Sequence, residues 1–534
     1  MAFPNIYTTG IASGWKVIDA SSLKAPLTLD AEVAIVGTGA GGGVAAEILS
    51  RAGLSVVMIE EGPLKTSDSF KDMDEARAYR DLYQEGAGRA TSDGAISILQ
   101  GRCVGGSTTV NWTSSFRTPG QTLAHWASQH EVAGHSEKEM APWFAKMEER
   151  LGIAPWAMAP NENNSILQRG CKALGWESHV IPRNVKGCLD AGYCGHGCPA
   201  NAKQSMLVTT IPSALEHGAT LLHRLRVRQV QHAANKVEGL VCDALGPDGR
   251  TPTGATVSVK ARHYVIAGGA INSPALLLRS QVPDPYKLLG KRTFIHPVNL
   301  SVATMPKRVD AFYGTPQSVA SDQFQWKDGV TGPIGYKLEV PPLAVGITAG
   351  ISNLFGLELK KSMAQLPNYN AVLALLRDGF VPQSEGGQVR LGSDGSPILD
   401  YEVSPYVWDG IRRAFLSMAE LQFAAGAASV RPAHLDSANY TTWNEARAAI
   451  LALPLEKFRA TLFTAHLMGG CGMSENPRSG VVNSKGRHHQ LANLSVMDAS
   501  TFPTSLGVNP QLTIYGLVAQ NVSALAGELG AKLQ

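Results

Sequence analysis

The residues whose type and spacing point most directly to chemistry are three glycines near the start of the chain. Gly37, Gly39 and Gly42 follow the pattern G-x-G-x-x-G. In this pattern the first glycine permits a tight turn, the second lets the backbone approach a pyrophosphate, and the third lets a helix pack closely on a strand. The N-terminus of the helix that follows offers free N–H groups and the positive end of its dipole to an anion. The spacing therefore predicts a dinucleotide-binding turn.

An acidic residue completes this pattern. Glu60 lies eighteen residues after Gly42, at the end of an apolar run, where a carboxylate can accept hydrogen bonds from a ribose hydroxyl. An acidic residue at this position argues against a cofactor with a 2′-phosphate. The motif does not by itself separate FAD from NAD.

A second glycine turn lies further along the chain. Gly105, Gly106 and Ser107 open a short polar segment that continues to Asn111. Such a turn can bring backbone N–H groups against a flavin or a phosphate. The alternative is a tight turn at the surface with no ligand.

Three of the seven cysteines fall within eleven residues. Cys188, Cys194 and Cys198 have the spacing C-x5-C-x3-C and precede a proline. Three thiolates at this spacing could hold an iron–sulfur cluster. The alternative is a glycine-rich loop with buried or paired thiols. Zinc would need a fourth ligand, for which His196 is the local candidate.

The elements that must position these residues can be predicted from the pattern of apolar residues. Residues 33–36 form a short apolar run typical of a buried parallel strand, residues 44–52 suit a helix with a small-residue face, and residues 55–59 suit a second strand. Residues 263–274 repeat the order of strand, glycine turn and helix. Together these segments predict a Rossmann-like α/β domain.

The middle of the chain has a different pattern. From residue 293 to 458, alternating strands mix with helices and no nucleotide turn occurs, whereas the last seventy residues return to short apolar strands and glycine turns. A chain of 534 residues is expected to form two large domains. We therefore expect a cofactor domain over 1–292 and 459–534, with an inserted α+β substrate domain over 293–458 that carries a largely antiparallel sheet.

The composition excludes some classes of function. The net charge is +3, from 47 basic and 44 acidic residues, which gives no indication of a nucleic-acid partner. The N-terminal segment lacks a basic region followed by an apolar core, so no signal peptide is predicted and a cytoplasmic location is expected, with membrane association or export with a partner as alternatives. The most apolar stretch, residues 341–357, is interpreted as loop and strand in the substrate domain, or else as an apolar lid or peripheral membrane contact.

Sequence motifs near the C-terminus indicate a family. Residues 465–471 read AHLMGGC, residues 493–503 read NLSVMDASTFP, and residues 507–510 read GVNP. With the three earlier glycine segments, and in this order, they resemble the glucose–methanol–choline (GMC) family of FAD-dependent oxidoreductases. The GVNP ending most resembles the cholesterol-oxidase and choline-oxidase branches, which carry a His/Asn pair. Residues 201–205, which read NAKQS, more closely resemble long-chain alcohol oxidases and cholesterol oxidases.

The resemblance implies a set of residues that bind FAD. The ADP half would be held by Gly37, Gly39, Gly42 and Glu60, with the backbone of Val227 at the adenine. The flavin and its linker would be approached by Gly105, Gly106, Ser107, Asn111, Asp498, Ala499 and Pro510. Some members attach FAD through a histidine just before the position of Asn111. Because Val110 occupies that position here, the FAD is expected to be non-covalent.

The resemblance also implies a catalytic pair, His466 and Asn509, that faces flavin N5. In alcohol oxidation the flavin takes a hydride, a histidine can take the hydroxyl proton, and an amide can hydrogen-bond to the oxygen. The implied function is oxidation of an apolar, long-chain or sterol-like alcohol to an aldehyde or ketone, with oxygen, a quinone or a redox protein as electron acceptor. One alternative is a sugar or polyol dehydrogenase subunit that passes electrons through an iron–sulfur cluster to a partner. Another is a flavin-binding protein without alcohol chemistry.

Overall fold

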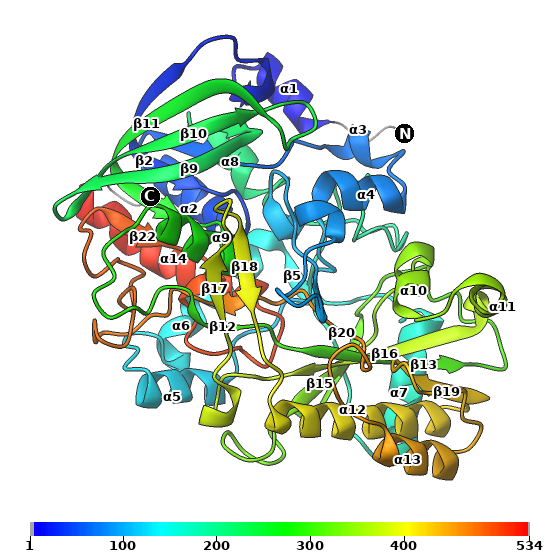
Figure 1. Ribbon diagram of the computed structural model, residues 1–534. Helices are drawn as coiled ribbons and strands as arrows, with labels where there is room; N and C mark the ends of the chain where they lie inside the picture. Colours follow the sequence, from blue (N-terminus) through cyan, green and yellow to red (C-terminus); the bar gives the residue numbers. More distant parts are fainter. Residues whose placement is uncertain (1–4, 532–534) are drawn as a thin grey trace.

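The protein folds around two large β-sheets, each with its own hydrophobic core (Figure 1). The computed structural model describes residues 5–531. Residues 1–4, with which the segment searched for a signal peptide begins, lie outside the described residues.

The first sheet contains the predicted dinucleotide unit. Strand β2 (Leu27–Val36) leads through the glycine turn into helix α2 (Ala40–Arg51) and then into β3 (Val56–Ile59), which pairs in parallel with β2. The strand order is β1-β8-β3-β2-β11-β10-β9, and β22 also pairs with β11. The other strands are β1 (Lys16–Asp19), β8 (Thr220–His223), β9 (Leu225–Ala233), β10 (Lys236–Leu245), β11 (Pro252–Ile266) and β22 (Leu494–Val496). The predicted Rossmann-like fold is confirmed.

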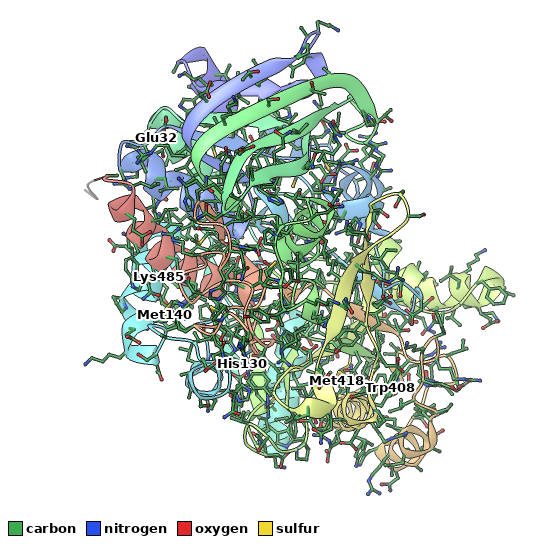
Figure 2. The ribbon with its side chains drawn as sticks, turned by 60° about the vertical axis from the view of Figure 1, so that its left-hand side comes forward. Glu32, His130, Met140, Trp408, Met418 and Lys485 are labelled. Carbon is green, nitrogen blue, oxygen red and sulfur yellow. The ribbon has the colours of Figure 1, made fainter. Side chains whose placement is uncertain are left out.

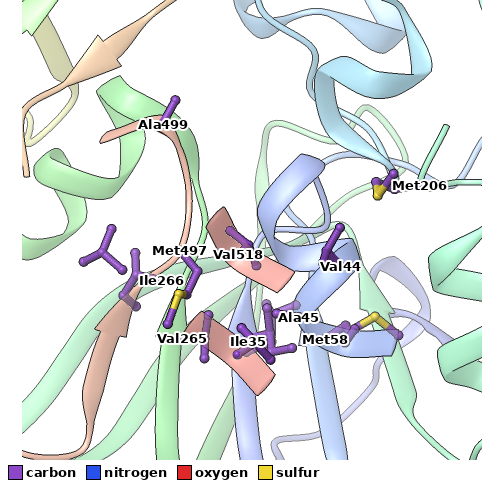
Figure 3. Packing of buried hydrophobic residues seen from close by; sticks show 14 of the residues in the cluster. Ile35, Val44, Ala45, Met58, Met206, Val265, Ile266, Met497, Ala499 and Val518 are labelled. Atoms are coloured by element: carbon purple, nitrogen blue, oxygen red, sulfur yellow. The ribbon is translucent and has the colours of Figure 1, made fainter. Parts of the chain in front are cut away.

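Helix α2 packs between this sheet and the C-terminal helix α14 (Gln511–Glu528). Figure 3 shows Val44 and Ala45 of α2 beside Ile35 of β2, with Val518 of α14 close by. The close approach of helix and strand depends on Gly42, because a Cβ there would lie 1.9 Å from the carbonyl oxygen of Gly37. Through β22 and α14 the end of the chain rejoins the first domain.

The second sheet is almost entirely antiparallel, as predicted for the substrate domain. Its order is β4-β20-β13-β16-β15-β14-β6, with β19 also paired to β13, and only the β4–β20 pair is parallel among the described strands. The strands are β4 (Ile96–Ile98), β6 (His179–Val180), β13 (Val298–Thr304), β14 (Val319–Phe324), β15 (Tyr336–Glu339), β16 (Tyr369–Leu376), β19 (Ser429–Pro432) and β20 (Leu462–Thr464). This sheet therefore also includes strands that precede residue 293 or follow residue 458 in the sequence. The domain boundaries at 293 and 458 stay a prediction.

Helices cover the outer face of the second sheet. Helix α12 (Pro405–Ala424) packs on β13 and β16, and α7 (Glu162–Leu174) and α13 (Trp443–Ala452) pack on α12. Figure 2 shows Trp408 and Met418 on α12, well separated from Met140 on α6 (Glu137–Leu151). Met418 belongs to the second core and Met140 to the first, where α6 packs on α14.

The described chain also forms two smaller sheets in addition to the two large ones. A four-stranded sheet has the order β18-β17-β12-β21, and β5 pairs with β7. These strands are β5 (Ile153–Pro155), β7 (Pro182–Asn184), β12 (Lys291–Phe294), β17 (Gly387–Leu391), β18 (Pro397–Asp400) and β21 (Met468–Gly469). The helices of the described chain also include α4 (Glu75–Leu82), α8 (Thr210–Glu216) and α9 (Gly269–Arg279).

The apolar stretch 341–357 forms helix where loop and strand were expected. It contains α10 (Val345–Ile351) and leads into α11 (Gly356–Ala364), and both stand at the right-hand edge of the molecule in Figure 1. Glu75 of α4 caps α10, because its carboxylate accepts the N–H groups of Gly346 at 2.7 Å and Ile347 at 2.9 Å. Within residues 5–531, no helix has the length and apolar character needed to span a bilayer.

Candidate active site

One large cavity of about 900 Å³ brings most of the predicted site residues together. Its lining comes from the ends of the first sheet, from the 100–114 segment and from the inner face of the second sheet. The predicted residues that line it are Gly37, Gly39, Glu60, Gly106, Ser107, Asn111, Val227, His466, Asp498, Ala499, Asn509 and Pro510. Gly42 and Gly105 do not line the cavity, although both contact residues that do.

The end of the cavity at α2 suits a pyrophosphate. Gly39 is the N-cap of α2, and no side chain caps this helix, so its first N–H groups remain available to a ligand. A Cβ added to Gly39 would lie 3.8 Å from the Cα of Gly106, an ordinary contact distance, so the second glycine turn lies beside the first. Gly37 adopts a φ of +95°, the left-handed conformation that its turn requires. This cradle fits the phosphates of a dinucleotide.

Glu60 is fixed in place beside this turn. Its Oε2 accepts the backbone N–H of Thr38 at 3.0 Å and the Thr38 hydroxyl at 2.7 Å, and its Oε1 accepts the N–H of Gly62 at 2.9 Å. Burial raises the pKa of the Glu60 carboxyl, and these hydrogen bonds oppose that rise. The carboxylate therefore reaches the cavity in one orientation, with lone pairs left for a ribose hydroxyl.

The second glycine turn lies directly against the first. A Cβ on Gly106 would lie 2.7 Å from the Cα of Gly39, so the two turns touch through their glycines. Gly105 has a φ of +90° and donates its N–H to the Thr38 hydroxyl at 3.1 Å. Gly105 therefore supports the first glycine turn through Thr38 and does not line the cavity. The family resemblance had implied that Gly105 approaches the flavin.

Asn111 lies beyond this turn, and its side chain has a hydrogen-bond acceptor without a partner among the described residues. Its Nδ2 donates to Oε1 of Gln511 at 2.7 Å, whereas its Oδ1 is buried and has no hydrogen-bond partner among the described residues. A buried acceptor without a partner costs free energy unless a ligand or water satisfies it. The position suits a polar group of the cofactor.

Asp498 joins the start of helix α9 to the site. Its carboxylate accepts the N–H of Gly269 at 2.8 Å and the hydroxyl of Ser273 at 2.6 Å, both on α9, and the N–H of Ser500 at 2.8 Å. These bonds hold Asp498 and the adjoining Ala499 at the cavity wall.

His466 lies just after β20, where the second sheet meets the cavity. Its Nδ1 lies 3.1 Å from Nδ1 of His296, and the two rings stack with centroids 5.2 Å apart. Its Nε2 makes no hydrogen bond to any residue within 5–531, and the side chain lines the cavity. Burial lowers the pKa of His466 to about 4, so the imidazole is unprotonated at neutral pH and one of its ring nitrogens carries a lone pair.

Asn509 faces the same cavity and is held by a buried acid. Its Nδ2 donates to Oε2 of Glu339 at 3.3 Å, and its Oδ1 is buried with no partner among the described residues. One N–H of the amide therefore remains free for a ligand. Oε2 of Glu339 also accepts from Gln317 at 2.5 Å, and Gln317 in turn accepts the Ser114 hydroxyl at 2.9 Å.

Sequence reasoning missed Glu339 and His296. Glu339 and Lys337 are charged residues on a strand whose side chains are all fully buried, and such residues usually have a specific partner. The sequence signal for Glu339 was weak, because the alternation Tyr-Lys-Leu-Glu is typical of a half-buried strand and does not reveal that both charges are buried. Lys337 pairs with Asp322 at 2.6 Å, and burial raises the pKa of the Glu339 carboxyl to about 7. No comparable signal marked His296, because its partner is 170 residues away.

Four apolar side chains line the same cavity as His466 and Asn509. Val298 of β13 lies opposite Leu375 of β16 and Phe463 of β20, and Leu373 shares a strand face with Leu375. All four side chains line the cavity. We call Val298, Leu373, Leu375 and Phe463 the apolar wall.

The structure does not support the iron–sulfur interpretation of Cys188, Cys194 and Cys198. Within residues 5–531, no group of three or more histidine, cysteine or acidic side chains is placed to hold a metal ion. The loop is held by a buried lysine instead. Nζ of Lys203 donates to the carbonyl oxygens of Cys194 at 2.6 Å, Thr109 at 2.7 Å and Asn111 at 2.8 Å, which ties the cysteine loop to the segment after the second glycine turn.

Comparison with known proteins identifies the family. The chain is 29% identical over 504 residues to a GMC-type oxidoreductase of Sinorhizobium fredii, covering 93% of this chain and 94% of that protein. It is 27% identical over 511 residues to a long-chain-alcohol oxidase of Arabidopsis thaliana, covering 90% of this chain and 65% of that longer protein. The fold matches the formate oxidase of Aspergillus oryzae with a TM-score of 0.69 at 14% identity, covering 95% of this chain and 100% of that chain.

Two family models described as GMC oxidoreductase match residues 79–298 and 382–517, which together make up about two thirds of the chain. The glycine cradle and the unpartnered polar atoms around it fit the FAD that this family uses. The protein therefore belongs to the GMC oxidoreductases and is an FAD-dependent oxidoreductase acting on CH–OH groups.

Proposed function

We propose that the protein oxidises an apolar, long-chain or sterol-like alcohol to the corresponding aldehyde or ketone. FAD, when bound, supplies the hydride acceptor for this reaction. One observation carries the proposal: a single cavity joins the glycine cradle to His466, Asn509 and the apolar wall.

The residues of the chain have distinct tasks in this proposal. Nε2 of His466 accepts the hydroxyl proton of the alcohol, which its low pKa permits because the ring is neutral at working pH. The free N–H of Asn509 donates to the alcohol oxygen as negative charge develops there. The hydrogen bond to Glu339 fixes the amide so that no reorientation is needed during the reaction.

The apolar wall supports the choice of substrate. Four aliphatic or aromatic side chains on three neighbouring strands give an alkyl chain a surface that excludes water, whereas a sugar would find few hydrogen-bonding partners there. The long-chain-alcohol oxidases among the relatives are consistent with this class of substrate. No observation on the described residues specifically favours the alternative, a sugar or polyol dehydrogenase subunit with an iron–sulfur cluster.

The electron acceptor in this proposal is oxygen, a quinone or a redox protein.

We further propose that α10 and α11 touch a lipid surface from which an apolar alcohol could be drawn. Phe355, Leu357 and Val345 are 87%, 64% and 59% exposed, and Lys360 and Lys361 follow on α11. Apolar side chains beside basic ones suit an anionic bilayer surface.

The experiment is anaerobic reduction of the bound flavin by a panel of alcohols. We expect long-chain primary alcohols or sterols to bleach the flavin, and polyols and sugars to leave it oxidised. Leu375→Gln should weaken reduction by the long-chain alcohols, whereas the control Leu435→Gln, at an exposed leucine after β19, should not. Bleaching by polyols alone would overturn the assignment of substrate class.

A further inference from the structure

We propose that His296 is a positioning residue that holds His466 in the tautomer whose Nε2 can accept a proton. The inference rests on the proposed function, since it concerns the same proton transfer. It assigns a task to a buried histidine that the sequence motifs did not single out.

The contact between the two histidines is specific. Their Nδ1 atoms are 3.1 Å apart, which is hydrogen-bond distance, and the rings are nearly parallel, with an interplanar angle of 29°. Two neutral imidazoles can share this bond only if one Nδ1 carries the proton and the other offers its lone pair. The bond therefore couples the tautomers of the two rings.

The backbone that carries His296 is held rigidly for this contact. The carboxylate of Asp378 accepts the N–H groups of Ile295 at 3.1 Å and His296 at 3.0 Å, and it also accepts the hydroxyl of Tyr401 at 2.8 Å. His296 has a φ of +48°, a left-handed conformation that a histidine adopts at a cost and keeps when surrounding contacts impose it.

A second link runs through Thr464. Its hydroxyl donates to the carbonyl oxygen of Ile295 and accepts the backbone N–H of His466 at 3.0 Å. One side chain thus joins the backbone of the two histidine segments, which come from β20 and from the turn before β13. The ring contact is therefore built into the second sheet.

The tautomer decides what His466 can do. If its Nδ1–H donates to Nδ1 of His296, its Nε2 carries the lone pair that faces the cavity. The alcohol then gives its proton to that lone pair, the O–H bonding electrons stay on the oxygen, and His466 becomes an imidazolium that still donates through Nδ1. The opposite arrangement would present an N–H at Nε2, which cannot accept a proton.

His296 is suited to remain the neutral partner. Burial, together with the positive charge of nearby Lys337, lowers its pKa well below the ordinary value for histidine. The charged groups around the pair are Lys337 on β15, which is paired with Asp322, and Asp378, whose carboxylate is occupied by the backbone and Tyr401. The Nε2 of His296 is buried without a partner among the described residues, a cost that a purely structural side chain would not need to carry.

The test compares the FAD-loaded wild type with His296→Leu and His296→Gln. Histidine-selective 15N NMR reports the tautomer, with the His466 signals assigned by their loss in His466→Gln. We expect the wild type to carry the proton on Nδ1 of His466, His296→Leu to lose this preference, and His296→Gln to keep it through its amide oxygen. In stopped-flow reduction by an active alcohol, His296→Leu should be roughly 10- to 100-fold slower, with partial recovery in His296→Gln.

Each outcome separates the two proposals. A proton on Nε2 of wild-type His466, or a tautomer unchanged by His296→Leu, would overturn the role of His296. Failure of every alcohol to reduce the flavin would overturn the proposed function, while the NMR result would still decide the pairing. If His296→Leu does not fold, His296→Gln and a second conservative variant, His296→Asn, provide the comparison.

Discussion

Asn509 donates a hydrogen bond to Glu339 at 3.3 Å, and thereby connects the end of the first domain to a buried acid on strand β15 of the second sheet. Glu339 lies opposite Leu373 of the apolar wall. In the proposed function, the strand pair β15–β16 therefore holds both the amide that would meet the alcohol oxygen and part of the apolar wall.

Glu339 should make stability depend on pH in a defined range. Burial raises its pKa from 4.5 to about 7, so the folded state keeps the proton in a range where the unfolded chain loses it. The contribution of Glu339 to the free energy of unfolding is fully present below pH 4.5. It falls by on the order of 3 kcal/mol as the pH rises to about 7.

We expect Glu339→Gln to remove this fall. The measurement is the thermal midpoint of wild type and variant at several pH values from 4.5 to 7.5, with Glu358→Gln on exposed α11 as the control. Parallel curves for wild type and Glu339→Gln would contradict the raised pKa.

His466→Ala should slow anaerobic flavin reduction by roughly two to four orders of magnitude, as expected for loss of a general base. Because burial lowers the pKa of His466 to about 4, the wild-type rate should stay level from pH 5 to 8 and fall as the pH drops through about 4. Stopped-flow traces across this range test both statements. A rate that is unchanged in the variant would remove His466 from the mechanism, and an inflection near pH 6.5 would place its pKa elsewhere.

Glu60→Ala should weaken FAD retention more than it slows turnover of the loaded fraction. The variant loses the carboxylate that fixes Thr38 and reaches the ribose, whereas His466 and the apolar wall are untouched. The ratio of flavin to protein after gel filtration measures retention, with Glu32→Ala on β2, outside the cavity, as the control. Full flavin content in Glu60→Ala would refute the ribose assignment.

Protein purified without oxygen should show flavin absorption bands and no bound iron. Cys194→Ser should retain the flavin, because Lys203 binds the carbonyl oxygen of residue 194 and not its side chain. Iron quantification and a visible spectrum of the same sample check this. About three irons for each flavin would restore the cluster interpretation.

The exposed apolar residues on and before α11 should support binding to lipid. We expect the double variant Phe355→Ser and Leu357→Ser to sediment less with anionic vesicles while keeping its activity towards a soluble alcohol. Leu435→Ser, which replaces an exposed leucine in the segment after β19, serves as the matched control. Equal sedimentation of all three proteins would reject the lipid contact.

The sequence by itself determined the features that depend on local spacing. The glycine turn at Gly37 and Gly39 requires special backbone geometry and close approach, so its residue types reveal the βαβ unit and a dinucleotide as the class of ligand. The apolar runs of β2 and β3 likewise follow from short-range periodicity. The helical form of 345–351 was missed, because glycine-rich apolar segments carry little signal for helix over strand.

The tertiary structure alone decided which distant groups meet. The stacking of His296 on His466, the hydrogen bond from Asn509 to Glu339, and the support of Asn111 by Lys203 each join residues 92 to 170 positions apart. Strand pairing and burial bring these partners together, and burial then sets the protonation of His466 and Glu339. Residue type and spacing specify the local turns, whereas desolvation and hydrogen-bond partners arise only when the two sheets close around the cavity.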